Sequence, residues 1–337
     1  ADVQLDYAVV TLRSLADKHF LIPAVETFAD VVTLPNFPEP QVTRIKKQIV
    51  NALQAEQQQP GSIVEKAFLK ALYNGEPYGN PALGTLQTVP KLDKSDVQRF
   101  YQRYYVAANA HVVLVGDLSR NDAMKIAEQI VNKLPKGTAA KSLVSSQFLA
   151  KPEIENIRFP SGQTHVLIGQ RAIARSSPDY FPLYVGNHIL GGGAMTSRLF
   201  ESVREKEGLA YSVNSYFYPL QQPGPFLVSL QTRNKEATRA IQIARKTLQN
   251  FVETGPTDSE LIATKNNIVN GFSLRLASNF AIFQNVIHLT TYQLPLNYLD
   301  TYCDNIKSVT KENVKTAFHN VINTNKLVTV TVGNSIY

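Results

Sequence analysis

The sequence has little cysteine and no long apolar run. Its single cysteine, Cys303, excludes a disulfide within the chain and any zinc cluster built on cysteine thiolates. No apolar stretch approaches the ~18 residues that a helix needs to cross a bilayer, so we expect no membrane span. With 44% hydrophobic and 18% charged residues, the composition is that of a globular protein whose length allows two domains.

Clusters of positive charge are also missing, although the formal net charge is +7. Lys and Arg are scattered singly or in short pairs such as Lys46-Lys47. A surface that binds nucleic acid normally gathers its cations on one stripe and interleaves them with aromatic residues. We therefore expect a solvated basic surface and no nucleic-acid partner.

The sequence repeats itself over a long distance. Val42–Asn51 reads V-T-R-I-K-K-Q-I-V-N, and Leu261–Asn270, which lies 219 positions further on, reads L-I-A-T-K-N-N-I-V-N. Val89–Tyr101 likewise resembles Ile306–Phe318, 217 positions further on. A fixed period of this length indicates a duplicated domain and not a short solenoid repeat.

The two copies set the expected domain boundaries. Residues 1–138 form the first copy, 139–150 a small and polar linker without a clear period, and 151–337 the second copy. Because residue 1 corresponds to about position 219, we expect the first copy to lack its N-terminal ~70 residues.

Hydrophobic periodicity predicts a mixture of strands and helical pairs in each copy. In the first copy we expect strands in Leu5–Leu15, which alternates, and in Ala110–Asp117. In the second copy we expect strands at 164–170, 210–218 and 225–232 around helices. The fold class predicted is α+β: tandem duplicated α/β-sandwich domains, each a mainly antiparallel sheet with helices on one side, with the first copy truncated at its N-terminus.

The segment Thr196–Ser215, T-S-R-L-F-E-S-V-R-E-K-E-G-L-A-Y-S-V-N-S, holds the densest group of candidate functional residues. Gly208 offers a left-handed position that ends a helix and turns the chain into a strand. Arg204 before this stop and Tyr211 after it then project to one side, where a guanidinium and a phenol O–H can hold a peptide carbonyl and stabilise an oxyanion. The alternative is structural: Arg204 pairs with Glu201 or Glu207, and Tyr211 packs in the core.

This segment resembles the R/Y motif in the C-terminal domain of the pitrilysin-type, inverted-zincin metallopeptidases. Pro77–Thr85 and the strand entry Tyr104–Asp117 are also similar to that family. The resemblance implies that Arg204 and Tyr211 are catalytic residues, and it favours the functional interpretation of the pair over the structural one.

The family's zinc site has no counterpart in this sequence. The H-x-x-E-H motif that the resemblance calls for is absent. The third ligand of active relatives, a glutamate counted back from a proline, corresponds to Ala52 before Pro60, and an alanine cannot bind a metal. Glu56, one helical turn further, is expected on a solvated face, and His188, which stands alone, is expected to be a core or interface histidine. We therefore expect no metal and no cofactor in this chain.

Three hypotheses follow from the resemblance. In the first, the chain is the non-zinc-binding subunit of a two-subunit peptidase that acts on peptides or unfolded proteins: a zinc-bearing partner supplies zinc and the general base, and Arg204 and Tyr211 act in trans. The paired bacterial subunits of the family suggest a periplasmic location. In the second, the chain is a non-enzymatic scaffold or peptide-binding protein. The third, a complete peptidase whose motif lies before residue 1, is disfavoured by Ala52.

Overall fold

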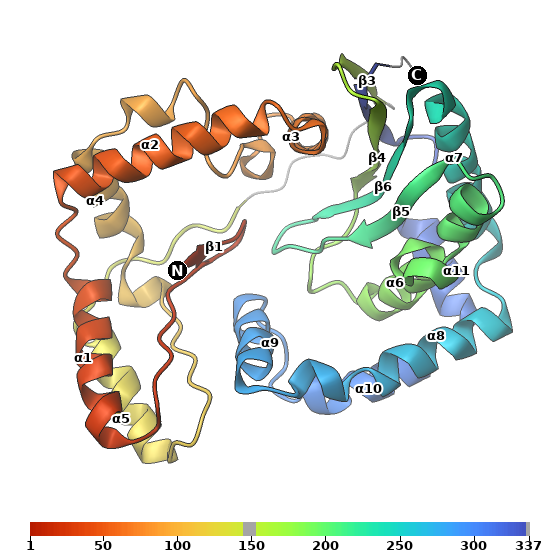
Figure 1. Ribbon diagram of the computed structural model, residues 1–337. Coiled ribbons are helices and arrows are strands. Elements are labelled where there is room, and N and C mark those ends of the chain that lie inside the picture. Colours follow the sequence, from red (N-terminus) through yellow and green to blue (C-terminus); the bar gives the residue numbers. More distant parts are fainter. Residues whose placement is uncertain (144–152, 335–337) are drawn as a thin grey trace. The chain divides into compact units, whose positions relative to one another are not determined.

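The structure, a computed structural model, describes residues 1–143 and 153–334 (Figure 1). Contacts group the chain into two compact units. The first unit comprises Ala1–Gln54, Ala82–Ser142 and Ser273–Leu294, and the second comprises Ala55–Pro81, Leu143–Phe272 and Pro295–Tyr337. The predicted boundaries at 138 and 151 therefore do not mark the compact units, because each half of the chain gives one segment to the unit built mainly from the other half. Of the predicted linker 139–150, residues 139–143 are neither helix nor strand, and 144–150 lie outside the described residues.

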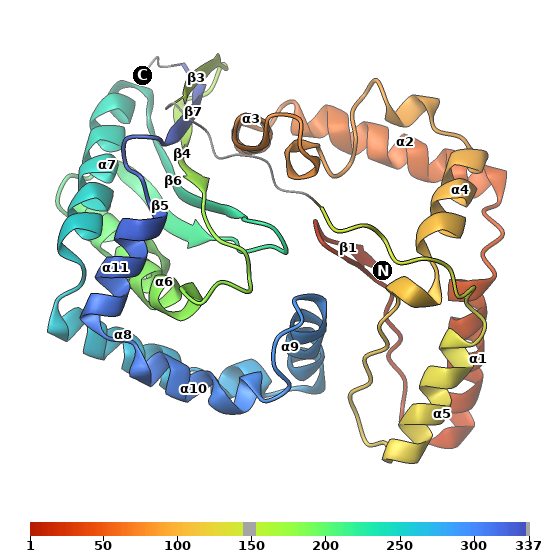
Figure 2. The same ribbon diagram turned by 180° about the vertical axis from the view of Figure 1, so that it is seen from behind.

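The second unit is built on a five-stranded mixed sheet. Its strands lie in the order β3-β7-β4-β6-β5, with β3 parallel to β7 and every other neighbouring pair antiparallel. Figure 2 shows β7 between β3 and β4. The strands are β3 (Glu153–Arg158), β4 (Gln163–Arg171), β5 (Ala210–Phe217), β6 (Pro225–Arg233) and β7 (Val328–Gly333). The α+β class with a mainly antiparallel sheet is confirmed.

Helices cover both faces of this sheet, so the prediction of helices on one side is wrong for this unit: α3, which comes from the first copy, covers the second face. Strand residues alternate between faces, so Val166 and Ile168 of β4 join the main core while Leu167 between them joins a second cluster. The main core contains side chains from α6, α7 and α11, and the second cluster contains Phe68 and Leu72 of α3, which packs on β4 and β7. Helices α3 and α7 accordingly lie on opposite sides of the sheet (Figures 1 and 2). The helices of this unit are α3 (Pro60–Tyr73), α6 (Tyr180–Asn187), α7 (Ala237–Thr254), α8 (Asp258–Asn270), α10 (Tyr298–Ser308) and α11 (Lys311–Val321).

The first unit is mainly helical. Its small apolar cluster has Val25, Ala29 and Ile130 at the centre, where α1 packs on α5. The helices of this unit are α1 (Lys18–Thr33), α2 (Glu39–Glu56, whose last two residues fall in the second unit), α4 (Lys94–Tyr104), α5 (Arg120–Val131) and α9 (Asn279–Thr291). Asp93 caps α4 through a reciprocal bond pair with Asp96, as its position before that helix predicts.

The predicted strands of the first copy do not form as expected. Ala110–Asp117 is not a strand, and of the opening segment Leu5–Leu15 only Ala8–Val9 (β2) pairs, with Asp2–Val3 (β1). The strand predictions are wrong for a physical reason: a strand forms only when neighbours take up its backbone hydrogen bonds. The matching strand of the second unit, β7, has β3 on one side and β4 on the other, and the described part of the first unit offers Ala110–Asp117 no such neighbours.

The order of helices repeats along the chain. Lys18, Glu39 and Pro60 begin α1, α2 and α3, and α7, α8 and α9 begin 219 positions later, at Ala237, Asp258 and Asn279. Helices α4 and α11 begin 217 positions apart, at Lys94 and Lys311, and have the same length. These offsets are the ones that the sequence repeats predict. The common fold of the two copies stays a prediction that this recurrence supports.

Candidate functional site

A π-helical turn carries Arg204, and Gly208 lies three residues beyond its end. This turn, Phe200–Glu205, is widened so that the amide of Lys206 donates to the carbonyl of Glu201, at 3.0 Å. Gly208 then has φ +62°, and its amide donates to the carbonyl of Arg204, at 3.0 Å. The left-handed stop at Gly208 is confirmed, and it directs the chain into β5.

Tyr211 is the extra residue of a β-bulge in the edge strand β5. Ala210 pairs with Thr232 and Ser212 with Gln231, which are adjacent residues of β6, so Tyr211 has no partner across the ladder. A bulge of this kind re-aims the side chain that it carries. The Tyr211 side chain is accordingly 79% exposed.

The structure brings Arg204 and Tyr211 into contact. The Arg204 Cζ lies 5.0 Å from the centroid of the Tyr211 ring and 4.8 Å from that of Phe200. Phe200 is buried, so it forms a fixed apolar support on which the half-buried Arg204 rests. Stacking of this kind leaves the edge of the guanidinium, where its N–H groups lie, available for an acceptor.

The acidic neighbours of Arg204 are engaged elsewhere. Glu201 pairs with Lys206, whose Nζ lies 2.8 Å from Oε1, and Glu207 pairs with Arg239 of α7. Among the residues that the structure describes, Arg204 takes part in no ion pair and no hydrogen bond through its side chain. The structural alternative is therefore contradicted on both counts, since Arg204 pairs with neither acid and Tyr211 does not pack in the core.

The glycines at 191–193 begin with a residue, Gly191, that packs closely against β5, the strand that carries Tyr211. Gly191 lies in a second π-helical segment, His188–Gly192, and a Cβ on Gly191 would lie 2.5 Å from the backbone N of Ser215. Asn187 joins the same point, because its side-chain amide donates to the Ser215 carbonyl at 3.0 Å and its oxygen accepts from the Ser215 hydroxyl at 2.7 Å. The glycines thus permit close approach of the protein's own edge strand.

A two-bonded ion pair between Arg198 and Glu260 holds the residues just before the π-helical turn that carries Arg204. Arg198 donates from Nε and Nη2 to the two oxygens of Glu260, at 2.6 and 2.7 Å. Burial alone would raise the pKa of Glu260, but hydrogen bonds from Arg198 and from Thr257 outweigh it and lower the pKa to about 2. Glu260 also closes the capping box of α8, so one carboxylate joins the Arg204 segment to the start of that helix.

The candidate metal ligands Ala52, Glu56 and His188 do not form a metal site. Ala52 is exposed on α2, and Glu56 is paired with Lys66. His188 is half-buried at the first position of its π-helical segment. Within 1–143 and 153–334, no three or more His, Cys, Asp or Glu side chains gather as a metal site would require. The residues present do not fit the zinc of the inverted zincins.

Sequence reasoning missed three supports of the pair: the Tyr211 bulge, the Phe200 ring beneath Arg204, and Arg239 on Glu207. The contact of Phe200 with Arg204 could have been predicted from the sequence, because Phe200 lies four positions before Arg204 and residues at this spacing meet on one face of a helix. The contact of Arg239 with Glu207 could not have been predicted in this way, since Arg239 lies on a separate helix, α7.

These features define a class of protein: an α+β chain with an Arg/Tyr donor pair and no clustered metal ligands in its described part. Comparison with known proteins agrees. The family model described as "Peptidase M16 inactive domain" matches residues 91–268. The crystal structure of a peptidase M16 inactive domain from Pseudomonas fluorescens is 35% identical with a TM-score of 0.92, over 96% of this chain and 77% of that one. The chain belongs to the peptidase M16 inactive-domain family.

Two curated relatives extend the comparison. An uncharacterized zinc protease of Streptomyces coelicolor is 30% identical over 247 residues, 71% of this chain and 53% of that protein. A non-peptidase homolog of Helicobacter pylori is 26% identical over 319 residues, 93% of this chain and 72% of that protein. The chain thus spans about half the length of the first of these. In its described part, no helix is both long and apolar enough to cross a membrane.

Proposed function

We propose that this chain is the non-zinc-binding subunit of a zinc-dependent endopeptidase. In this proposal Arg204 and Tyr211 act in trans, with the zinc site of a partner subunit of the same family. The observation that carries the proposal is the Arg204–Tyr211 pair itself: two hydrogen-bond donors in contact, one on a π-helical turn and one on a β-bulge, with the guanidinium in no ion pair with any described residue. Irregular backbone of both kinds is common at functional sites.

The proposed role of the pair is to bind and polarise a peptide carbonyl. The guanidinium and the phenol O–H donate to the carbonyl oxygen, and both bonds strengthen as negative charge develops there. The partner's zinc supplies the activated water when bound. Phe200 supports Arg204, and the bulge directs Tyr211 out of the ladder and against the guanidinium, so the two donors already lie together before a substrate binds.

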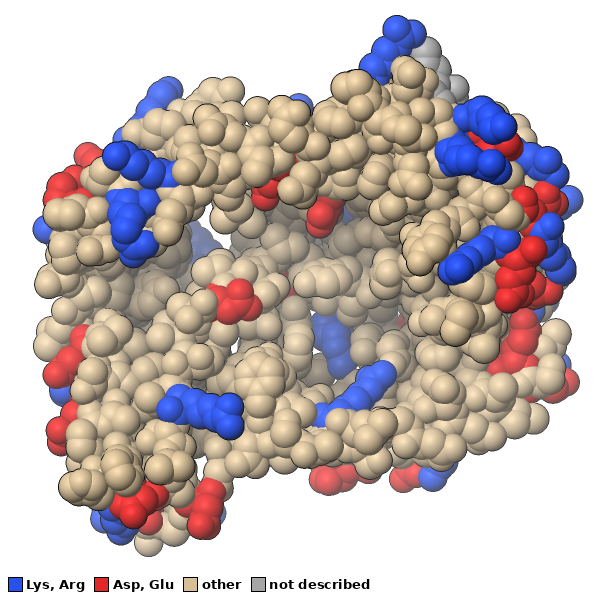
Figure 3. Space-filling view, viewed as in Figure 1, with Lys and Arg blue, Asp and Glu red and all other residues tan. Residues whose placement is uncertain are grey.

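The substrate, partner and location form part of the same proposal. A peptide or an unfolded protein is the substrate, and no nucleic acid is involved. Figure 3 supports this last point, since Lys and Arg side chains form no continuous stripe on the face it shows. The periplasm is the proposed location, from the resemblance to the paired bacterial subunits of the family.

Reconstitution tests the proposal. The purified chain, a zinc-bearing family member from the same organism, and their mixture are assayed on an unfolded protein substrate, with metal analysis of each chain. We expect turnover from the mixture well above that of either chain alone, and no stoichiometric zinc in this chain. About one tightly bound zinc in this chain without a purification tag, or a partner whose turnover is unchanged by mixing, would contradict the proposal.

A second function has one observation in its favour. The Helicobacter pylori relative that matches 93% of this chain is named a non-peptidase homolog. A scaffold or peptide-binding role would need no catalytic donor, so it predicts normal function in variants that lose the Arg204 and Tyr211 donors. Variants that remove the Arg204 or Tyr211 donor therefore distinguish the two functions: the peptidase role predicts a loss of turnover, and the scaffold role predicts normal function.

A further inference from the structure

Arg204 has donors that its own protein does not use. A guanidinium offers five N–H groups in a rigid fork, and among the described residues no side chain or carbonyl accepts from this one. Arg204 is also half-buried against two aromatic rings, which limits its contact with water. The Tyr211 hydroxyl, likewise without a hydrogen-bond partner in the described part of the chain, adds a donor on the ring that the guanidinium contacts.

The acceptor that best fits this arrangement is a carboxylate. A neutral carbonyl presents one oxygen to the fork, whereas a carboxylate presents two, in a geometry that matches two parallel N–H groups. An ionised carboxylate also adds an attraction between opposite charges, which a neutral carbonyl lacks. In the absence of a reacting substrate, a carboxylate ligand therefore competes well against a peptide carbonyl.

We propose that Arg204 and Tyr211 form a receptor for the C-terminal carboxylate of a peptide. This inference deepens the proposed function and rests on it for the peptide, because cleavage after the polarised carbonyl leaves a new carboxylate at that same carbon. Hydrolysis adds one water across the C–N bond: its oxygen stays on the carbonyl carbon, and its protons go to the leaving amine and the solvent. The site then holds the acid product that carries this carboxylate.

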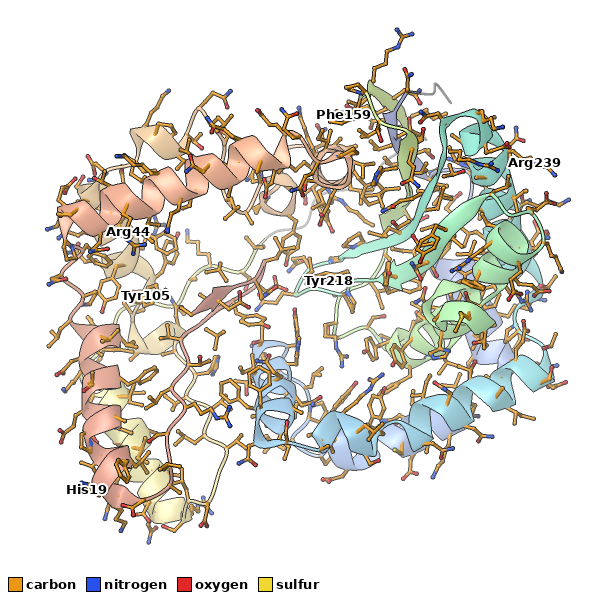
Figure 4. All side chains as sticks on the ribbon, viewed as in Figure 1. His19, Arg44, Tyr105, Phe159, Tyr218 and Arg239 are labelled. Atoms are coloured by element: carbon orange, nitrogen blue, oxygen red, sulfur yellow. The ribbon has the colours of Figure 1, made fainter. Side chains whose placement is uncertain are left out.

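Arg239 and Lys206 are positioning residues for this receptor. Glu207 and Glu201 lie three residues after and before Arg204, within reach of its guanidinium on a helical turn. Arg239 and Lys206 hold these two carboxylates and so prevent them from acting as internal ligands. Figure 4 labels Arg239 on α7, the helix that supplies this contact.

Binding of labelled peptides tests the inference without a partner or zinc. The chain has no Trp, so the probe is a short peptide with an amino-terminal fluorophore, followed by anisotropy. Three forms are compared: a free C-terminal carboxylate, a C-terminal amide, and an amide with one internal aspartate, with acetate as competitor. We expect the free acid to bind roughly 10-fold more tightly than the amide, and millimolar acetate to compete weakly. Equal binding of acid and amide would overturn the inference, and so would an internal aspartate that restores full affinity.

Variants separate the receptor from a general charge effect. Arg204→Ala and Arg204→Lys should remove the preference for the acid, because lysine keeps the charge but lacks the fork. Arg233→Ala, an exposed arginine at the end of β6, is the matched control and should keep it. Arg239→Ala should weaken acid binding a few-fold by releasing Glu207, and Arg239→Ala with Glu207→Gln should restore it. Absence of this rescue would refute the positioning role.

The failure of this inference is distinguishable from failure of the proposed function. If acid and amide bind equally while Arg204→Ala still lowers turnover in the reconstituted enzyme, the carboxylate receptor is wrong and the proposed function stands. If the acid preference is present but turnover does not depend on Arg204, the receptor stands and the catalytic role is wrong.

Discussion

Arg171 of β4 and Glu76, which follows α3, form a two-bonded ion pair that is nearly closed to solvent. Nη2 lies 2.6 Å from Oε1 and Nη1 lies 3.1 Å from Oε2, and the two side chains are 4% and 17% exposed. The Arg171 Nε also donates to the Leu72 carbonyl at 2.7 Å, and its Cζ lies 4.5 Å from the Tyr73 ring centroid. One arginine of the sheet thus holds the end of α3 against that sheet.

Removing the acid of this pair should destabilise the protein strongly. Glu76→Gln leaves the buried Arg171 without its counter-charge, which we expect to lower the free energy of unfolding by about 3 kcal/mol. Urea unfolding, monitored by circular dichroism, measures this change in the free energy of unfolding. Asp30→Asn, which breaks the exposed pair with Lys133, is the control and should cost less than about 1 kcal/mol. Similar losses in both variants would show that burial of the Arg171 pair is unimportant.

Glu260 should make stability fall in mildly to strongly acidic solution. Its folded pKa of about 2 lies below its ordinary value of 4.5, so the unfolded chain takes up the proton first as pH falls. The stabilising contribution is therefore complete above pH 4.5 and is lost between 4.5 and about 2. Allowing for solvent screening of a partly exposed group, we expect about 1–2 kcal/mol. The difference in unfolding free energy between the wild type and Glu260→Gln, measured across this pH range, should shrink as pH falls; a constant difference would be inconsistent with the ion pair.

Gly191 should tolerate no side chain. In Gly191→Ala the new methyl group meets the backbone N of Ser215 at 2.5 Å, so β5 or the π-helical segment has to shift. We expect a loss of about 2–3 kcal/mol in unfolding free energy. Gly162→Ala, where a Cβ has nothing within 4 Å, is the matched control and should change stability by less than about 1 kcal/mol. Thermal melts of both variants that coincide would contradict the packing argument.

The first unit should self-associate at high concentration. A shallow apolar groove of about 510 Å³ lies between its opening segment and α1, lined by residues that include Leu12, Phe28 and Val31. Val31 is 63% exposed there, and neighbouring Ile22 is 51% exposed. Val31→Ser should therefore reduce the associated fraction seen by analytical ultracentrifugation. Leu296→Ser, in the second unit and 97% exposed before substitution, should not. Equal effects would rule out a specific role for the groove.

Much of the fold follows from local patterns in the sequence. Helices with an apolar stripe, such as α2 and α11, and their caps, such as Asp93, depend on residues within a few positions of one another. Strands depend on partners distant in sequence, and the prediction therefore failed at Ala110–Asp117. The packing of α3 on the five-stranded sheet also depends on residues distant in sequence. Arg171 of β4 donates to the Leu72 carbonyl, and Phe68 packs in one cluster with residues of β4 and β7.

The candidate site was predictable in its residue types but not in its geometry. The left-handed glycine at 208 follows from its position between a helix and a strand, and that placed Arg204 and Tyr211 together. The bulge at Tyr211 depends on the register of β5 against β6, which no residue type encodes. The freedom of Arg204 from Glu207 depends on Arg239, so it could not be inferred from the segment itself.

The catalytic role of Tyr211 is the central claim, and turnover of Tyr211→Phe tests it most directly. The substitution removes only an O–H from an exposed side chain, so neither stability nor association with a zinc-bearing partner should change. In the reconstituted peptidase we expect turnover to fall by about 10²–10³-fold, as for loss of one oxyanion donor. Tyr216→Phe, on the same strand and 47% exposed, should keep turnover within a few-fold of wild type. Normal turnover in Tyr211→Phe, with the partner bound as tightly as in the wild type, would contradict the account.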